Sequence, residues 1–257
     1  MASRPAHAQP VEVRLRRDNA VAALLHLVQA VLVLTLATGF ALPVVATYMQ
    51  GPPGTPPADP TKLFEIPTGA AVAAFLVLSA LAHALVATVW WPRYVADLGR
   101  KRNPARWVEY SLSSSLMIIL IAQLVGISDV AALLALFGVN ASMILFGWLQ
   151  ERYEEPGGGG WLPFVFGCIA GIVPWLAITI YLLTLGSTSS ASPPGFVYGI
   201  FVSLFVFFNV FALNQWLQYR AKGRWSDYIF GERVYILLSL TAKTALAWQV
   251  FAGTLAG

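Results

Sequence analysis

Long apolar runs alternate with short polar connectors along the whole chain. A helix that crosses a bilayer needs about 20 mostly apolar residues, and seven runs reach that length. They predict spanning helices at about Asn19–Tyr48, Ile66–Trp91, Pro104–Ile127, Asp129–Gln150, Leu162–Leu185, Pro194–Tyr219 and Ser226–Leu255. We therefore expect an all-α membrane protein, a seven-transmembrane-helix bundle that occupies residues 1–257 as one domain.

The connectors between these runs carry the residues that usually end helices. A polar tail covers about residues 1–18, and a Pro/Gly-rich loop covers about residues 49–65. Gly157–Gly160 and Gly186–Pro194 separate later spans, and Asp129 is a helix-start acid. The first run could instead be a signal peptide, but its apolar stretch of about 28 residues is longer than the apolar core of such peptides.

Composition supports a membrane location and argues against a soluble domain, a nucleic-acid-binding protein and a disulfide-bonded or metal-binding protein. Of the 257 residues 58% are hydrophobic and 11% are charged, whereas soluble domains carry about 25% charged residues. The basic pI of about 9.3 does not indicate a nucleic-acid partner, because the basic residues lie in short connectors. Cys168 is the one cysteine, so it forms no intrachain disulfide and suggests no metal site.

The basic residues also predict how the protein sits in the membrane. All of the sixteen Lys and Arg except Lys62 and Lys243 lie in a few segments. These segments are the tail, the second-to-third, fourth-to-fifth and sixth-to-seventh connectors, and the entries of the third and seventh spans. Positive residues concentrate on the cytoplasmic side. We therefore expect a multi-pass cell-membrane protein with a cytoplasmic N-terminus and an extracellular C-terminus.

Four ionisable residues lie inside the predicted spans: His26, His83, Glu109 and Lys243. At about 1.5 Å of rise per residue, all four reach one layer about 8–15 Å below the cytoplasmic surface. Ionisable groups inside a membrane are costly and are candidates for function.

Hydroxyl groups at helical spacing support this layer. Ser79, Ser113 and Ser239 each lie four residues from one of these ionisable groups, and residues four apart share a helix face. Arg106 and Glu109 are three apart and could also interact.

Lys243 carries the sharpest chemical hypothesis. A lysine among Leu238, Leu240 and Ala242 is held at a cost of about 3 kcal/mol, and an unprotonated amine in an apolar pocket can form a Schiff base with an aldehyde. Glu109, interpreted as the only carboxylate buried in a span, would then be the counterion. The alternative is a structural Lys–Glu ion pair, and either histidine alone could be a satisfied interior group.

The predicted spans are also rich in aromatic residues, which suit either a bound polyene or ordinary packing. They are Trp175, Phe201, Phe205, Phe207, Phe208, Phe211 and Trp248.

Three stretches together carry a family resemblance: Arg106–Ser111 with Ser113–Leu120, Phe207–Tyr219, and Glu232–Lys243. They resemble the heliorhodopsins, retinal proteins that are inverted in the membrane relative to the pumping microbial rhodopsins. The resemblance covers all seven spans and implies a rhodopsin-like bundle. It also implies the inside N-terminus that the charge distribution predicts.

The resemblance assigns roles to individual residues. Lys243 would bind all-trans retinal as a covalent protonated Schiff base, and Glu109 would be its counterion. His26 and His83 would belong to a polar cavity that takes part in proton acceptance, lined by Ser79, Ser113 and Ser239. Around the polyene or its ring we expect Met117, Asn140, Ile144, Phe208 and Gln215.

The first loop departs from the family pattern. In the family this segment forms a small strand pair at a dimer contact, but here Gly51–Pro57 is rich in proline, which cannot donate to a strand ladder. The resemblance implies a homodimer, and the proline content argues against a share for this loop.

The residues and the resemblance together predict a photoreceptor rather than an enzyme. Light would isomerise the retinal and drive a slow photocycle for sensing, without ion pumping, acting on an unknown cytoplasmic signalling partner. No span carries an Asp or Glu between Lys243 and the outer face, which argues against proton transport. A light-driven transporter or channel, and a light-regulated modulator of a partner enzyme, remain the alternatives. His26 and His83 could hold a metal in principle, but nothing else supports a metal site.

Overall fold

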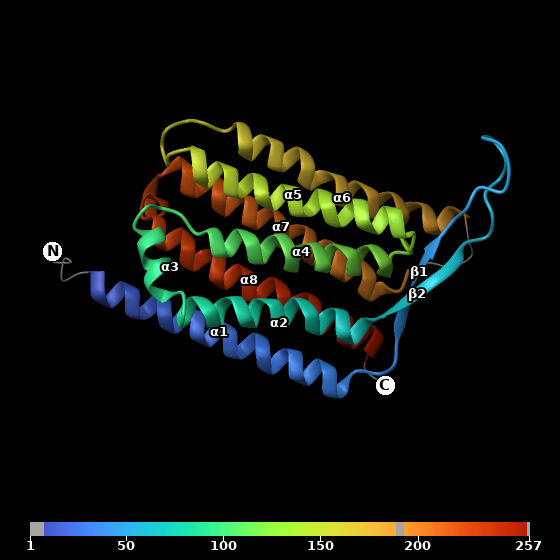
Figure 1. Ribbon diagram of the computed structural model, residues 1–257, viewed down its shortest axis with the longest axis horizontal. Coiled ribbons are helices and arrows are strands. Elements are labelled where there is room, and N and C mark those ends of the chain that lie inside the picture. The colour runs from blue at the N-terminus through green and yellow to red at the C-terminus, as the bar shows by residue number, and fades with distance from the viewer. Residues whose placement is uncertain (1–7, 189–192, 256–257) are drawn as a thin grey trace.

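The computed structural model describes residues 8–188 and 193–255 and consists mainly of helices. Seven of the described helices are long and apolar enough to cross a membrane, which confirms the predicted number of spans. Figure 1 shows them side by side, with their axes nearly aligned. They are α1 (Ala8–Leu36), α2 (Thr68–Ala87), α4 (Pro104–Leu124), α5 (Val130–Tyr153), α6 (Leu162–Thr188), α7 (Gly195–Arg220) and α8 (Tyr228–Val250), which continues as the π-helical turn η2 (Phe251–Leu255).

Short helices occupy two of the polar connectors. The connector after α2 contains α3 (Trp91–Leu98), and the connector after α7 contains the 3-10 helix η1 (Gly223–Ser226). The predicted tail is partly wrong, because α1 is already helical from Ala8. Residues 1–7, with Arg4 among them, lie outside the described part of the chain.

The first connector contains an antiparallel strand pair, so the proline argument against strands here was wrong. Strand β1 (Ala41–Ala46) pairs with β2 (Thr61–Pro67), with Ala41 opposite Pro67 and Ala46 opposite Thr61. The proline-rich segment is the link between the two strands, where no ladder hydrogen bonds are needed. The first span also ends at Leu36 rather than at Tyr48, and the chain then becomes extended.

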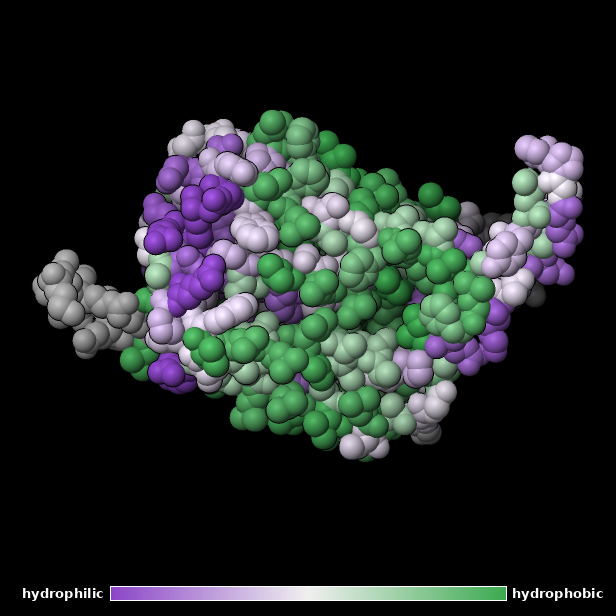
Figure 2. Space-filling model, in the orientation of Figure 1, coloured by the Kyte–Doolittle hydropathy of each residue, from purple (hydrophilic) through white to green (hydrophobic). Residues whose placement is uncertain are grey.

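The two ends of the bundle differ in character. We call the end with α3, η1 and the start of α1 the basic end, and the opposite end, from which β1 and β2 project, the hairpin end (Figure 1). Figure 2 shows hydrophobic residues across the middle of the bundle and hydrophilic residues gathered at the basic end. Exposed apolar side chains cover the middle of the described helices, as a surface in contact with lipid requires.

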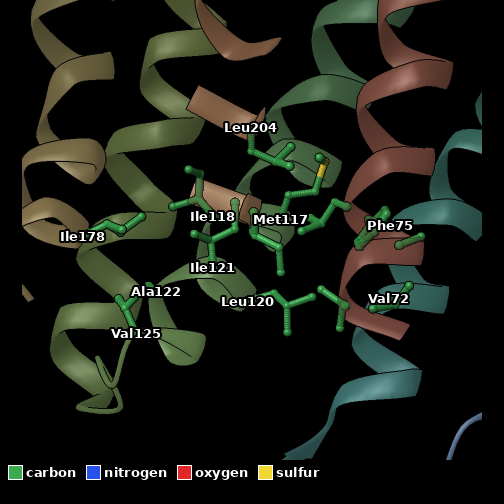
Figure 3. Packing of buried hydrophobic residues seen from close by; sticks show 14 of the residues in the cluster. Val72, Phe75, Met117, Ile118, Leu120, Ile121, Ala122, Val125, Ile178 and Leu204 are labelled. Carbon is green, nitrogen blue, oxygen red and sulfur yellow. The ribbon is translucent and has the colours of Figure 1, made fainter. Parts of the chain in front are cut away.

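Helix α4 is the central element of the packing. It is the most buried of the seven spans, and its side chains Ile118, Leu120 and Ile121 are almost completely enclosed. Figure 3 shows them packed between Phe75 of α2 and Ile178 of α6. A group on the buried face of α4 is therefore enclosed by neighbouring helices.

At each end of the bundle, a side chain immediately before a helix caps the first turn of that helix. Asp129 accepts hydrogen bonds from the backbone N–H groups of Ala131 and Ala132 at the start of α5, as its predicted role requires. Asn103 does the same for Arg106 at the start of α4. Such caps satisfy backbone donors that the first turn of a helix leaves free, and here they help to fix where α4 and α5 begin.

Candidate functional site

Lys243 of α8 and Glu109 of α4 form a buried ion pair in the half of the bundle nearer the basic end. The Lys243 Nζ lies 2.7 Å from Glu109 Oε1, and both side chains are almost inaccessible. Lys243 Nζ also lies 2.9 Å from Ser239 Oγ, while Ser79 of α2 donates to Glu109 Oε1 at 2.6 Å. Two buried charges are tolerated when they are paired and hydrogen-bonded, and here three helices supply the partners.

The two histidines lie next to each other on α1 and α2. Their rings are stacked with centroids 5.9 Å apart. His83 Nδ1 lies 2.8 Å from Asn19 Oδ1. His26 is completely buried, and neither of its ring nitrogens has a hydrogen-bond partner among the described residues. A buried polar group without a partner is unusual, which makes His26 a candidate for a role beyond packing.

An apolar cavity of about 310 Å³ begins at Lys243 and extends between α4, α5, α6 and α7. Of the residues expected around a polyene, Met117, Ile144, Phe208 and Gln215 line it, as do Ser113 and Ser239. Asn140 was also expected there, but it is not among the lining residues, because its amide is turned toward Ser114 and Ser115, to which it donates at 2.9 and 3.0 Å. The remaining wall is largely aromatic: Trp107, Tyr110, Phe164, Trp175, Phe205, Phe211 and Tyr235.

The aromatic wall is held in place by edge-to-face contacts. Trp175 of α6 meets Phe205 and Phe208 of α7, each with ring centroids 5.3 Å apart and the rings nearly perpendicular. This is a favoured geometry for aromatic pairs. At the other end, the Tyr110 ring faces Lys243 Nζ at 5.0 Å. The cavity therefore has a rigid apolar wall and one charged end.

A second, polar cluster lies beside this site at the basic end and was missed from the sequence. Arg106 of α4 pairs with Glu232 of α8 and, at 2.9 Å, with Glu151 of α5. All three side chains are buried. Glu109 is therefore not the only carboxylate buried in a span, and Arg106 pairs with these two carboxylates rather than with Glu109.

Further side chains complete this cluster. Asn103 donates to Glu232 at 2.7 Å, and its backbone N–H donates to Glu151 at 2.9 Å. The indole of Trp107 also donates to Glu151. Glu151 and Glu232 lie at helix ends next to Arg152 and Arg233, so the sequence suggested exposed charges there. No local sequence signal marks the two glutamates as buried.

A small polar cavity of about 40 Å³ lies between the cluster and the ion pair. Its lining includes Asn19, His83, Arg106, Glu109 and Glu232. A water molecule needs about 10–15 Å³ of such space, so this cavity has room for water. Tyr94 of α3 also lines it, and burial, together with the charge of Glu232, raises the pKa of Tyr94 above its usual value. This tyrosine thus stays neutral where α3 covers the cavity.

The comparisons with known proteins identify the family and the fold. The heliorhodopsin family model matches residues 15–255, so the chain belongs to the heliorhodopsin family, a family of retinal photoreceptors that is generally non-enzymatic. A similar solved structure is the transmembrane domain of the rhodopsin phosphodiesterase of Salpingoeca rosetta, with a TM-score of 0.65 and 12% identity over 97% of this chain and 88% of that one. That likeness shows a rhodopsin-like fold. No curated protein matches the sequence.

Family membership implies a retinal chromophore, and the residues around Lys243 fit one. The cavity volume lies at the lower end of the range of about 300–1,000 Å³ that is typical of small-molecule sites. Its lining is mostly apolar, and its polar groups include Ser113, Ser239 and Lys243 itself. Ser113 Oγ is buried beside it without a hydrogen-bond partner among the described residues. The described part of the chain contains no group of three or more His, Cys, Asp or Glu side chains that could hold a metal ion.

Proposed function

We propose that this protein is a light sensor of the heliorhodopsin type, in which Lys243 holds all-trans retinal as a protonated Schiff base. The observation that carries this proposal is the buried lysine amine that lines an aromatic cavity, 2.7 Å from a buried carboxylate. Bound retinal would supply visible-light absorption and a change of shape on illumination. The chain would supply the attachment point, the charge that balances it and the groups that receive its proton.

Glu109 is the proposed counterion. Its Oε1 accepts hydrogen bonds from both Lys243 Nζ and Ser79, which keeps the carboxylate oriented toward the positive nitrogen. A nearby opposite charge favours the charged form of a group. Glu109 would therefore keep the attached nitrogen protonated in the dark, with Ser79 and Ser239 as supporting groups.

The distribution of carboxylates supports sensing rather than transport. In the described part of the chain the buried carboxylates are Glu109, Glu151 and Glu232, and all three lie on the side of Lys243 toward the basic end. The spans carry no carboxylate between Lys243 and the hairpin end. A proton that leaves Lys243 would therefore move toward the basic end and return the same way.

The proposed orientation places the basic end in the cytoplasm. The charges that predict it include Arg93, Arg100, Lys101, Arg152 and Arg224, in line with the concentration of positive residues on that side. Histidine protonation would then occur near the cytoplasmic face, where a signalling partner could respond to it. We also propose a homodimer, by analogy with the family.

Reconstitution with retinal tests the chromophore. The full chain, expressed with added all-trans retinal, should show a visible absorption band that is absent in Lys243→Ala. Lys62→Ala, which removes an exposed lysine of β2, is the matched control and should keep the band. No band in the wild type, or a band that survives Lys243→Ala, would rule out the proposal.

Glu109→Gln tests the counterion, because it removes the charge but keeps the shape. A negative charge at Glu109 stabilises the ground state of the protonated chromophore more than its excited state, so the band should shift to the red. Glu65→Gln on the exposed strand β2 is the control and should leave the band in place. An unshifted band in Glu109→Gln would assign the counterion to another residue.

A pH measurement distinguishes sensing from transport. Illuminated cells in unbuffered medium should show no light-dependent pH change, with or without a protonophore. A change that the protonophore abolishes, and that Lys243→Ala lacks, would establish a transporter instead.

A further inference from the structure

Asn19 of α1 forms a hydrogen bond with His83 of α2, and the proposed function assigns no role to it. The Asn19 side chain is buried, and its Oδ1 lies 2.8 Å from His83 Nδ1. Its other amide atom, Nδ2, donates to the backbone oxygen of Leu15 at 2.9 Å, one helical turn earlier. The amide is therefore held from both sides, between its own helix and α2.

These two bonds determine which way the amide is turned. A backbone carbonyl oxygen can only accept, so the Asn19 atom that faces Leu15 must be the nitrogen. The oxygen then faces His83, and an amide oxygen also can only accept. His83 Nδ1 must therefore carry a hydrogen. In a neutral imidazole only one nitrogen is protonated, which leaves His83 Nε2 as a free acceptor.

We propose that Asn19 is a positioning residue that holds neutral His83 with its proton on Nδ1, so that Nε2 is the atom that receives the proton leaving Lys243. This inference rests on the proposed function. The N–H bond at Lys243 would break and a new N–H bond would form with the lone pair of His83 Nε2, either directly or through water. The bond from His83 Nδ1 to Asn19 would remain and become charge-assisted, which strengthens it.

The surroundings of the two histidines distinguish them. His83 lines the small polar cavity together with Glu109, next to the ion pair. His26 does not line it, and among the described residues no hydrogen-bond partner sets its tautomer. His83 is therefore the primary acceptor, and His26 contributes its stacked ring.

Nitrogen NMR of the histidine rings tests the tautomer directly. The full chain, reconstituted in lipid with ring-¹⁵N-labelled histidine, is measured in the dark, and His83→Gln identifies the His83 signals. The wild type should show a protonated Nδ1 and an unprotonated Nε2. Asn19→Leu should move His83 toward the Nε2-protonated form, whereas Asn19→Asp, which keeps an acceptor oxygen, should keep Nδ1 protonated.

A matched control comes from the same helix. Gln29 also donates its side-chain amide to a carbonyl one turn earlier, that of Leu25, so Gln29→Leu should leave the His83 signals unchanged. With retinal bound, Asn19→Leu should also slow proton transfer from the chromophore after a flash, on the order of fivefold, the equivalent of one ordinary hydrogen bond.

Two results would overturn the inference: a wild-type His83 protonated on Nε2, or identical His83 signals in the wild type and Asn19→Leu. The wild-type spectrum decides the tautomer even if Asn19→Leu fails to fold. It does so without light or a chromophore band, so it separates this inference from the proposed function, which stands or falls on the visible band.

Discussion

The two halves of the bundle solve the problem of burial in opposite ways. Toward the basic end, buried charged side chains of α4, α5 and α8 pair with one another, around Arg106 and around Lys243. Toward the hairpin end, α4 is surrounded by aliphatic and aromatic side chains of its neighbours, such as Val72 and Phe75 of α2 and Ile178 of α6 (Figure 3). The same central helix thus passes through both environments.

This difference assigns separate tasks to the two halves. Buried polar groups are costly unless they are paired, so a cluster of them points to a functional role. The polar half holds the groups that could exchange a proton, and the apolar half separates them from the hairpin end. The contrast makes predictions about stability that differ from one half to the other.

The largest effect is expected from removing the cation of the polar half. Arg106→Leu leaves Glu151 and Glu232 buried without their partner, which should cost about 4 kcal/mol, within the range of about 3–5 for broken buried pairs. Thermal unfolding in detergent measures this loss. Arg93→Leu, which removes an exposed arginine at the same end, should change stability by less than about 1 kcal/mol.

Equal stability of Arg106→Leu and Arg93→Leu would contradict this interpretation of the polar half. Combining Arg106→Leu with Glu151→Gln and Glu232→Gln removes the unpaired charges and should recover part of the loss.

A somewhat smaller effect is expected from a cavity in the apolar half. Ile118 is completely buried on α4, and Ile118→Ala should cost about 3 kcal/mol, because the surrounding side chains close the cavity only in part. Ile180→Ala on the outer face of α6, where the side chain is 59% exposed, is the matched control and should have little effect. Equal unfolding temperatures for the two variants would mean that α4 is not the centre of the packing.

The smallest effects come from the two helix caps, one in each half. Asp129→Ala at the hairpin end should cost about 1 kcal/mol, the usual value for a cap. Asn103→Ala at the basic end should cost about 2 kcal/mol, because it also removes a donor from buried Glu232. Denaturant unfolding of both variants tests the order. Equal costs for the two variants would show that Asn103 acts only as a cap.

The span count and the main pair of the site could be predicted because each depends on local properties. The thickness of a bilayer sets the length of an apolar run, and the rise of a helix converts residue numbers into depth. The contact between Lys243 and Glu109 agrees with the depth that helix rise predicted for both. The roles of the residues around them remain predictions.

Features that join distant segments could not be predicted in the same way. Arg106 and Glu109 have the spacing of an ion pair, yet Arg106 faces α5 and α8 and pairs with residues 45 and 126 positions away. The strand pair was wrongly doubted because of the prolines in Gly51–Pro57, although this segment lies in the link between the strands and takes no part in the pairing. Helix neighbours and strand register depend on the packing of the entire chain.

The sequence by itself determined that this chain crosses a membrane seven times and carries a lysine and a carboxylate at one depth, because hydrophobicity and helix rise act within each segment. Only the tertiary structure decided which charges became partners. It placed Glu151 and Glu232 on Arg106, and Asn19 on His83, because side chains from different helices meet only once the helices have packed.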